Sequence, residues 1–136
     1  VGSEMCIRDR FTPGSHGSTF AGNPLGAAAG LATLDVIEDE NLVTNAEARG
    51  KQLRDGIMAT GNPLFVSVRG RGLLDAVELK HPCSHAVMNY CLEHGLIVNA
   101  VAPNALRFAP PLIVTAQDVD QALAILKDVP TDLPDD

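Results

Sequence analysis

The sequence has little basic charge, too few cysteines for a disulfide framework and no long apolar run. It contains 10 lysine and arginine residues against 17 aspartate and glutamate residues, a formal net charge of −7. Binding to nucleic acid or to an anionic membrane without sequence preference requires a basic face, so we expect neither partner. No apolar stretch approaches the roughly 20 residues that span a bilayer, which also argues against a membrane protein.

The cysteines and the N-terminal stretch favour a cytoplasmic protein. Cys6, Cys83 and Cys91 are an odd set without the spacing of a disulfide framework, so we expect reduced thiols. No basic start is followed by an apolar stretch and a cleavage site, so the sequence does not predict secretion.

The length and the apolar content indicate one modest domain with unusual ends. With 136 residues and 46% hydrophobic side chains, the chain can bury its own core. Residues 1–10 show neither helical nor strand periodicity, and we interpret them as a non-native linker. Residues 129–136 are rich in proline and aspartate and are predicted to form a disordered tail.

Between these ends the hydrophobic period changes repeatedly. Asn23 and Pro24 suit the start of a helix, Gly95 suits the end of one, and Thr115 with Asp118 forms a capping-box pattern. The predicted helices are 24–40, 42–59, 84–94 with Ser84 as its cap, and one that opens at Thr115; the predicted strands are 64–68, 73–79, 96–101 and 105–109. Residues 69–72 are predicted to form the turn between the first two strands. This order predicts an α+β fold with helices on one face of a small sheet.

The loop before the first helix, GSHGSTFAGNP at 14–24, combines glycines with hydroxyl side chains. Backbone N–H groups and hydroxyls next to a helix N-terminus can hold a phosphate. The alternative is a tight turn that only caps the helix, because the loop fits neither GxGxxG nor GxxxxGK[ST]. The residues alone leave both interpretations open.

Four strings in a fixed order carry a family resemblance. They are HGSTFAGNPLGAAAGLATLDVIEDENL, VRGRGLLDAVEL, GLIVNAVAPNALRFAPPLIVT and DVDQAL, and together they extend from about Thr12 to Lys127. In this order they resemble the C-terminal third of the class III, pyridoxal-phosphate-dependent aminotransferases. The resemblance implies the C-terminal part of a fold-type I enzyme. Residues 11–60 would be the loop and helices from the end of a large domain, and 61–128 a small α+β domain.

The resemblance also implies roles for three residues. Ser18 and Thr19 would contact the cofactor phosphate, with Thr19 reaching the cofactor of the partner subunit in a homodimer. Arg107 would receive the α-carboxylate of the amino-acid or 2-oxoacid substrate, since a guanidinium fits a carboxylate with two parallel hydrogen bonds. From the sequence context alone, a surface arginine in a small salt bridge is the alternative. One departure is Ala21, where the family has glycine; a left-handed backbone at this position would strain an alanine.

The implied reaction is a transamination with pyridoxal phosphate as the electron sink. The resemblance favours N-acetylornithine and 2-oxoglutarate, in arginine biosynthesis, and leaves ornithine, succinylornithine and 4-aminobutyrate open as donors. The family's Schiff-base lysine lies upstream of the first string, and Lys51, Lys80 and Lys127 match no motif. We therefore expect this stretch to be inactive alone. A non-catalytic α+β module for binding or dimerisation is the alternative from another functional class.

Other polar residues are weaker candidates. His81, Cys83 and His85 are spaced like metal ligands, but a zinc site needs three or four ligands with recognisable spacing, and no partner cluster accompanies them. We therefore expect no metal. His16 is predicted to make a local hydrogen bond or to face water. Arg69 and Arg71 flank glycines and are predicted to be exposed turn charges.

Overall fold

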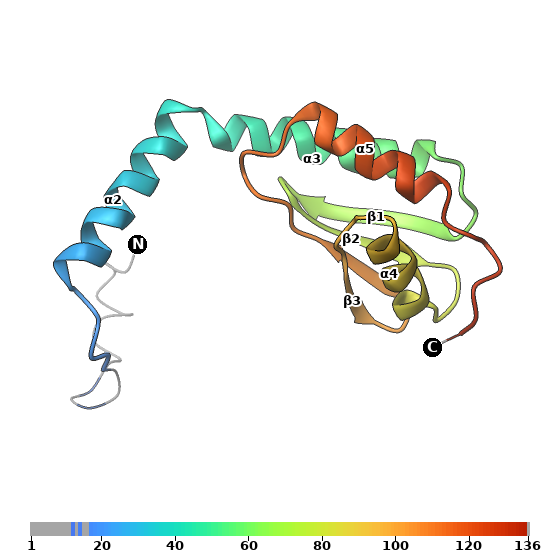
Figure 1. Ribbon diagram of the computed structural model, residues 1–136, viewed down its shortest axis with the longest axis horizontal. Helices are drawn as coiled ribbons and strands as arrows, with labels where there is room; N and C mark the ends of the chain where they lie inside the picture. The colour runs from blue at the N-terminus through green and yellow to red at the C-terminus, as the bar shows by residue number, and fades with distance from the viewer. Residues whose placement is uncertain (1–11, 13, 15–16, 136) are drawn as a thin grey trace. The chain divides into compact units, whose positions relative to one another are not determined.

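The computed structural model describes residues 12, 14 and 17–135. The elements follow the predicted order, which is confirmed (Figure 1). They are α2 (Pro24–Asp39), α3 (Leu42–Ala59), β1 (Phe65–Arg71), β2 (Leu74–Leu79), α4 (Ser84–Glu93), β3 (Asn99–Ala102), β4 (Ala105–Phe108) and α5 (Ala116–Lys127). The predicted linker at 1–10 lies outside the described residues.

The chain divides into two compact units, one up to Val36 and one from Ile37 onward. The second unit includes α3 together with the sheet, because α3 packs against β1 and α5. The predicted boundary near residue 60 refers to the domains of a longer polypeptide and stays a prediction.

The first unit contains most of α2, whose start is capped as predicted. The Gly26 backbone N–H donates to Asn23 Oδ1 over 2.7 Å, and Pro24 occupies the first helical position. Apolar side chains of this helix lie exposed: Leu25 at 81%, Leu31 at 64% and Leu34 at 59%. No residue of α2 is buried within the described part of the chain.

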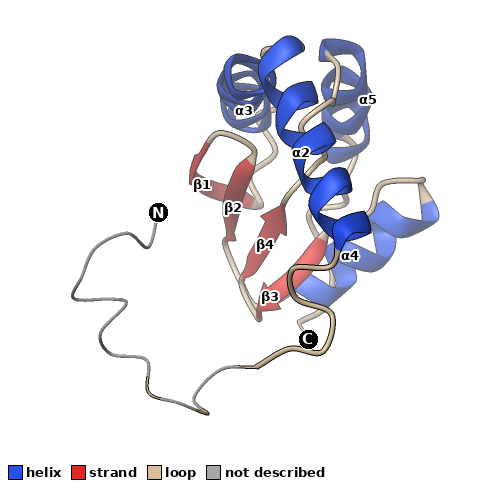
Figure 2. Ribbon diagram, turned by 90° about the vertical axis from the view of Figure 1, so that its left-hand side faces the viewer, coloured by secondary structure: helices blue, strands red, loops and turns tan. Residues whose placement is uncertain are grey.

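The second unit is built on an antiparallel sheet with strand order β1-β2-β4-β3 (Figure 2). Alternate side chains of β2 and β4 point into the core, among them Val77, Leu79, Leu106 and Phe108. The same core contains residues of all three helices of this unit: Leu53 and Ile57 of α3, Val87 and Cys91 of α4, and Val119 and Leu126 of α5. One face of the sheet is thus covered by helices and the other is left open. The predicted α+β class is confirmed.

The structure corrects the predicted turn between the first two strands. β1 continues through Arg69, Gly70 and Arg71, and the connection consists of Gly72 and Leu73. Gly70 pairs with Asp75 in this ladder, and a Cβ at position 70 would lie 2.1 Å from Asp75 Oδ1. Gly72 has a φ of 57°, the left-handed conformation that a tight connection requires. Glycine at 70 therefore serves a close approach and not a turn.

The segment after α4 also differs from the prediction. The N-cap of α4 is Cys83, so Ser84 is the first helical residue and not the cap. At the other end Gly95 has a φ of 86°, and the Leu96 N–H donates to the Cys91 carbonyl over 2.8 Å. This Schellman arrangement keeps the backbone of Leu96 in the helix terminus, and β3 begins only at Asn99.

The C-terminal segment makes more contacts than a disordered tail would. Val129 is 3% exposed and its carbonyl accepts from Asn62 Nδ2 over 2.8 Å. Asp135 Oδ1 lies 2.7 Å from His81 Nδ1. The core therefore extends past the boundary predicted at residue 128, because an apolar side chain directly after α5 fills it.

Candidate phosphate loop and carboxylate arginine

The loop before α2 is a pair of turns closed on the helix by Asn23. The Ala21 N–H donates to the Ser18 carbonyl over 3.4 Å, and Asn23 Nδ2 donates to the Phe20 carbonyl over 2.7 Å. Two described residues of the loop have a left-handed backbone, Gly14 with a φ of 86° and Gly22 with a φ of 71°. Among the described residues Asn41 alone has a positive φ without being glycine. Ala21 is therefore compatible with the loop.

Ser18 and Thr19 lie exposed in this loop. Asn23 caps the helix, and the side chains of Ser18 and Thr19 have no hydrogen bond to other described residues. The hydroxyls remain available as donors beside a helix N-terminus, the arrangement in which a phosphate dianion is held. The loop thus fits a phosphate group. His16 lies outside the described residues.

Arg107 belongs to the second unit, whereas the loop belongs to the first. It lies on β4, where its register partners are Ala76 of β2 and Asn99 of β3. Leu106 and Phe108 on either side are buried in the core, so Arg107 stands on the open face of the sheet. Its guanidinium has no acidic partner among the described residues, and so is available for an external anion. The alternative, a surface salt bridge of Arg107, is therefore not observed among the described residues.

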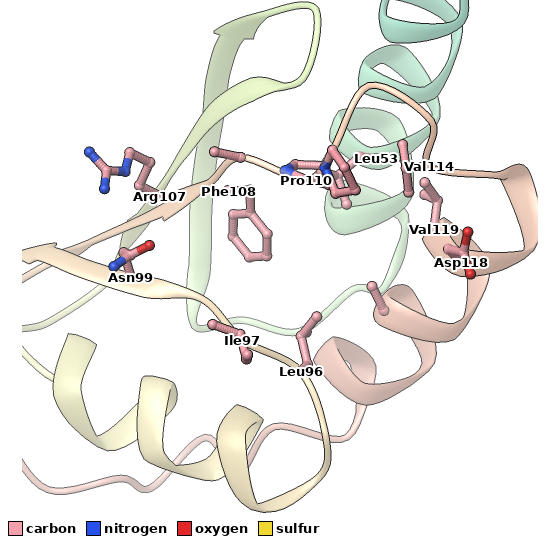
Figure 3. A pocket seen from close by; sticks show the side chains of 13 residues that line it. Leu53, Leu96, Ile97, Asn99, Arg107, Phe108, Pro110, Val114, Asp118 and Val119 are labelled. Carbon is pink, nitrogen blue, oxygen red and sulfur yellow. The ribbon is translucent and has the colours of Figure 1, made fainter. Parts of the chain in front are cut away.

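Arg107 lies at the edge of a cavity of about 390 Å³ (Figure 3). The lining is mainly apolar, from α3, α5 and the ends of the strands. It includes Leu53, Phe108, Pro110, Val114 and Val119. The polar and charged lining groups are Asn99, Arg107 and Asp118. Figure 3 shows Arg107 and Asn99 on neighbouring strands at the same end of the cavity.

Asp118 is committed to the start of α5. The Thr115 N–H donates to Asp118 Oδ2 over 2.9 Å, and the Asp118 N–H donates to Thr115 Oγ1 over 3.2 Å, so the predicted capping box is confirmed. The hydrogen bonds from Thr115 lower the pKa of Asp118. The Asp118 carboxylate is therefore an anion that caps its own helix, and the Arg107 guanidinium points away from the apolar lining at the edge of the cavity (Figure 3).

A buried ion pair lies near the β1–β2 connection, and the sequence analysis missed it. Arg54 Nη1 donates to Asp75 Oδ1 over 2.8 Å and to the Gly72 carbonyl over 2.9 Å. Asp75 is 1% exposed, and its Oδ2 atom has no hydrogen-bond partner. Burial raises the pKa of Asp75, and Arg54 opposes that shift. The signal was in the strand alternation, since Asp75 falls in phase with Val77 and Leu79.

The remaining candidates lie apart from these features. His81 pairs with Asp135, Cys83 is buried and His85 is exposed. No cluster of three or more metal-ligating side chains occurs in the described residues. Lys51 pairs with Asp55, and Lys80 and Lys127 are exposed. None of the described helices is both long and apolar enough to span a membrane.

Comparison with known proteins shows the family of this chain. The family model described as Aminotransferase class-III matches residues 2–129. The chain belongs to the class III aminotransferase family. The enzymes of this family depend on pyridoxal phosphate.

Several class III relatives share most of this chain. An acetylornithine aminotransferase of Bifidobacterium longum (strain NCC 2705) is 98% identical over 126 residues, which cover 93% of this chain and 29% of the relative. An ornithine aminotransferase of Staphylococcus carnosus (strain TM300) is 43% identical over 132 residues, covering 95% of this chain and 32% of the relative. The chain thus spans about a third of the length of these relatives.

Solved structures of aminotransferases also match most of this chain over about a third of their own length. A crystal structure of acetylornithine aminotransferase from Elizabethkingia anophelis matches with a TM-score of 0.75 and 39% identity, covering 89% of this chain and 33% of that one. The ornithine aminotransferase of Toxoplasma gondii ME49 matches with a TM-score of 0.77 and 35% identity, covering 89% and 30%. The fold is that of part of a pyridoxal-phosphate aminotransferase, as predicted.

Proposed function

We propose that the complete polypeptide containing this chain is an acetylornithine aminotransferase. It would transfer an amino group between N-acetylornithine and 2-oxoglutarate, in the cytoplasm, as a step of arginine biosynthesis. The observation that carries the proposal is the 98% identity over 126 residues to the Bifidobacterium longum protein of that name. The ornithine enzyme of Staphylococcus carnosus, at 43% identity, makes ornithine the second candidate donor.

In this proposal Arg107 binds the α-carboxylate of the substrate. Its place on the open sheet face leaves all its donors available, and a bidentate pair fixes both the charge and the plane of the carboxylate. The neighbouring β2 residue is Ala76, whose methyl group leaves room above the strand. The orientation of the substrate Cα then follows from a rigid strand and not from a loop.

Ser18 and Thr19 hold the cofactor phosphate in this proposal. Hydroxyl donors to a dianion form charge-assisted hydrogen bonds, about twice as strong as neutral ones. Pyridoxal phosphate, when bound, supplies an electron sink for the substrate Cα. We assign Thr19 to the cofactor of the partner subunit in a homodimer. No described lysine lies in a motif of the family, so we propose that this stretch is inactive alone.

Two alanine variants of the complete enzyme separate these roles. Arg107→Ala lowers kcat/KM for amino and oxo acids about a hundredfold and leaves cofactor affinity unchanged, because two bonds to a charged group are lost. Thr19→Ala weakens pyridoxal phosphate binding about tenfold. Arg71→Ala, an exposed arginine on β1, and Thr44→Ala, an exposed threonine on α3, are the controls and leave both quantities unchanged. The reverse pattern, or no effect, would contradict the assignments.

Hybrid dimers test the assignment of Thr19 to the partner. When Thr19→Ala and Arg107→Ala subunits with different tags are co-expressed, one site of the hybrid receives the native Arg107 from one subunit and the native Thr19 from the other. At limiting cofactor we expect about half of the wild-type activity. If Thr19 served its own subunit, both sites of the hybrid would carry a defect and no activity would be regained.

A further inference from the structure

The open face of the sheet places four residues in one row across the strands. Arg69 of β1 pairs with Ala76 of β2, Ala76 pairs with Arg107 of β4, and Arg107 pairs with Asn99 of β3. Side chains of register partners stand on the same face, with Cβ atoms about 5 Å apart. Arg107 therefore has a methyl group on one side and a carboxamide on the other.

Asn99 and Arg107 share one cavity, and Arg69 does not. Both Asn99 and Arg107 line the cavity of about 390 Å³ (Figure 3). Arg69 stands two strands from Arg107, about 10 Å away. It lines a separate cavity of about 160 Å³ that also includes Glu78. A small anion held by Arg107 on the open face of the sheet therefore meets Asn99, its register partner on β3, as the next polar side chain.

The chemistry of asparagine suits this position. Its amide group supplies two N–H donors without a charge, so it adds a hydrogen bond to a carboxylate and leaves the guanidinium cationic. An aspartate there would pair with Arg107 and compete with the substrate. The Asn99 side chain is exposed and has no hydrogen bond to other described residues, so its donors are available.

We infer that Asn99 binds the substrate carboxylate together with Arg107 and so is a further substrate-binding residue of the enzyme. The inference rests on the proposed function, because it takes the anion at Arg107 to be the carboxylate of an amino acid or a 2-oxoacid. Two guanidinium donors and one amide donor from adjacent strands would then hold the carboxylate.

The test uses the complete enzyme loaded with pyridoxal phosphate and compares Asn99→Ala and Asn99→Asp with the wild type. Asn99→Ala raises KM for both substrates about tenfold with kcat within about twofold, because one hydrogen bond to a charged group is lost. Asn99→Asp raises KM further, about a hundredfold, since its carboxylate pairs with Arg107. Calorimetric titration with 2-oxoglutarate gives the same order of dissociation constants independently of turnover.

Asn104→Ala is the matched control. Asn104 is an exposed asparagine in the β3–β4 connection, and it lines the cavity of Arg69 and not that of Arg107. Its variant keeps wild-type KM and dissociation constant. Asn99 variants that match this control in an active enzyme would overturn the inference and leave the proposed function intact. A folded, cofactor-loaded wild type that transaminates none of the candidate donors would overturn both.

Discussion

At Asp75, burial and a neighbouring guanidinium act on one carboxyl in opposite directions. The side chain is fully buried, with Oδ1 bonded to Arg54 and Oδ2 without a partner. Burial penalises the charged form more than Arg54 favours it, so the pKa of Asp75 is raised. A carboxyl with a raised pKa in the folded state contributes less stability as the pH rises from its unfolded value towards the folded value.

The stability effect of Asp75→Asn therefore depends on pH. The asparagine does not ionise, so the free energy of unfolding of the variant, relative to the wild type, increases as the pH rises above about 4. Denaturant unfolding of both proteins across the acidic to neutral range measures this difference. Glu47→Gln, at an exposed position on α3, removes the same charge and shows no such trend. A difference that shrinks with rising pH would mean that the ion pair outweighs the desolvation.

At the scale of elements, α3 approaches the β1–β2 connection closely enough to require glycine. A Cβ on Gly50 would lie 1.7 Å from the Gly72 carbonyl oxygen, and Arg54, one turn later, donates to the same carbonyl. The helix and the hairpin are thus held together by backbone contact and by the Arg54–Asp75 pair. Because β2 lies between β1 and β4, this contact also fixes the strand beside Arg107.

Gly50→Ala is expected to destabilise the protein in spite of the better helix propensity of alanine. The obstructing atom is backbone and cannot rotate away, so the clash costs about 3 kcal/mol, against about 1 kcal/mol gained in the helix. The midpoint of thermal or denaturant unfolding measures the net loss. Gly30→Ala in α2, where a Cβ meets nothing within 4 Å, is the control and lowers no midpoint. Equal midpoints for the two variants would contradict the close approach.

The elements that the sequence predicted best are those with local signals. Asn23 with Pro24 and Thr115 with Asp118 fix the starts of two helices through contacts three residues away. The turn predicted at 69–72 was wrong because the glycine at position 70 is required by the close approach of Asp75 across the hairpin. Strand pairing creates this contact, so the local sequence does not show it. The predicted strand start at Leu96 was wrong for a similar reason. Its apolar side chain is typical of a strand, but its N–H donates to a carbonyl at the end of α4.

In the candidate site too, residues with a local sequence signal were predicted and a residue placed by strand pairing was not. Arg107, Ser18 and Thr19 were predicted through the resemblance of their motifs to the family, and their roles stay predictions. Asn99 was not singled out, because its place beside Arg107 depends on the register of β3 with β4. The bulge between Ala100 and Ala102 in that pair hides the register from simple counting along the sequence.

At the scale of the whole molecule, the loop with Ser18 and Thr19 lies in one compact unit and Arg107 in the other. The chain corresponds to 29% of its Bifidobacterium longum relative, and α2 keeps Leu25, Leu31 and Leu34 exposed. In the complete polypeptide we expect these side chains to be covered. The proposed function therefore requires that the complete enzyme binds pyridoxal phosphate and the amino donor at the same time.

The most direct test is the visible absorbance of the purified complete enzyme before and after addition of N-acetylornithine. We expect a cofactor band in the visible range that changes at lower concentrations of N-acetylornithine than of ornithine or 4-aminobutyrate. In Arg107→Ala the band remains and the response shifts to higher concentrations. A well-folded enzyme without such a band, or with a band that no amino donor alters, would contradict the account.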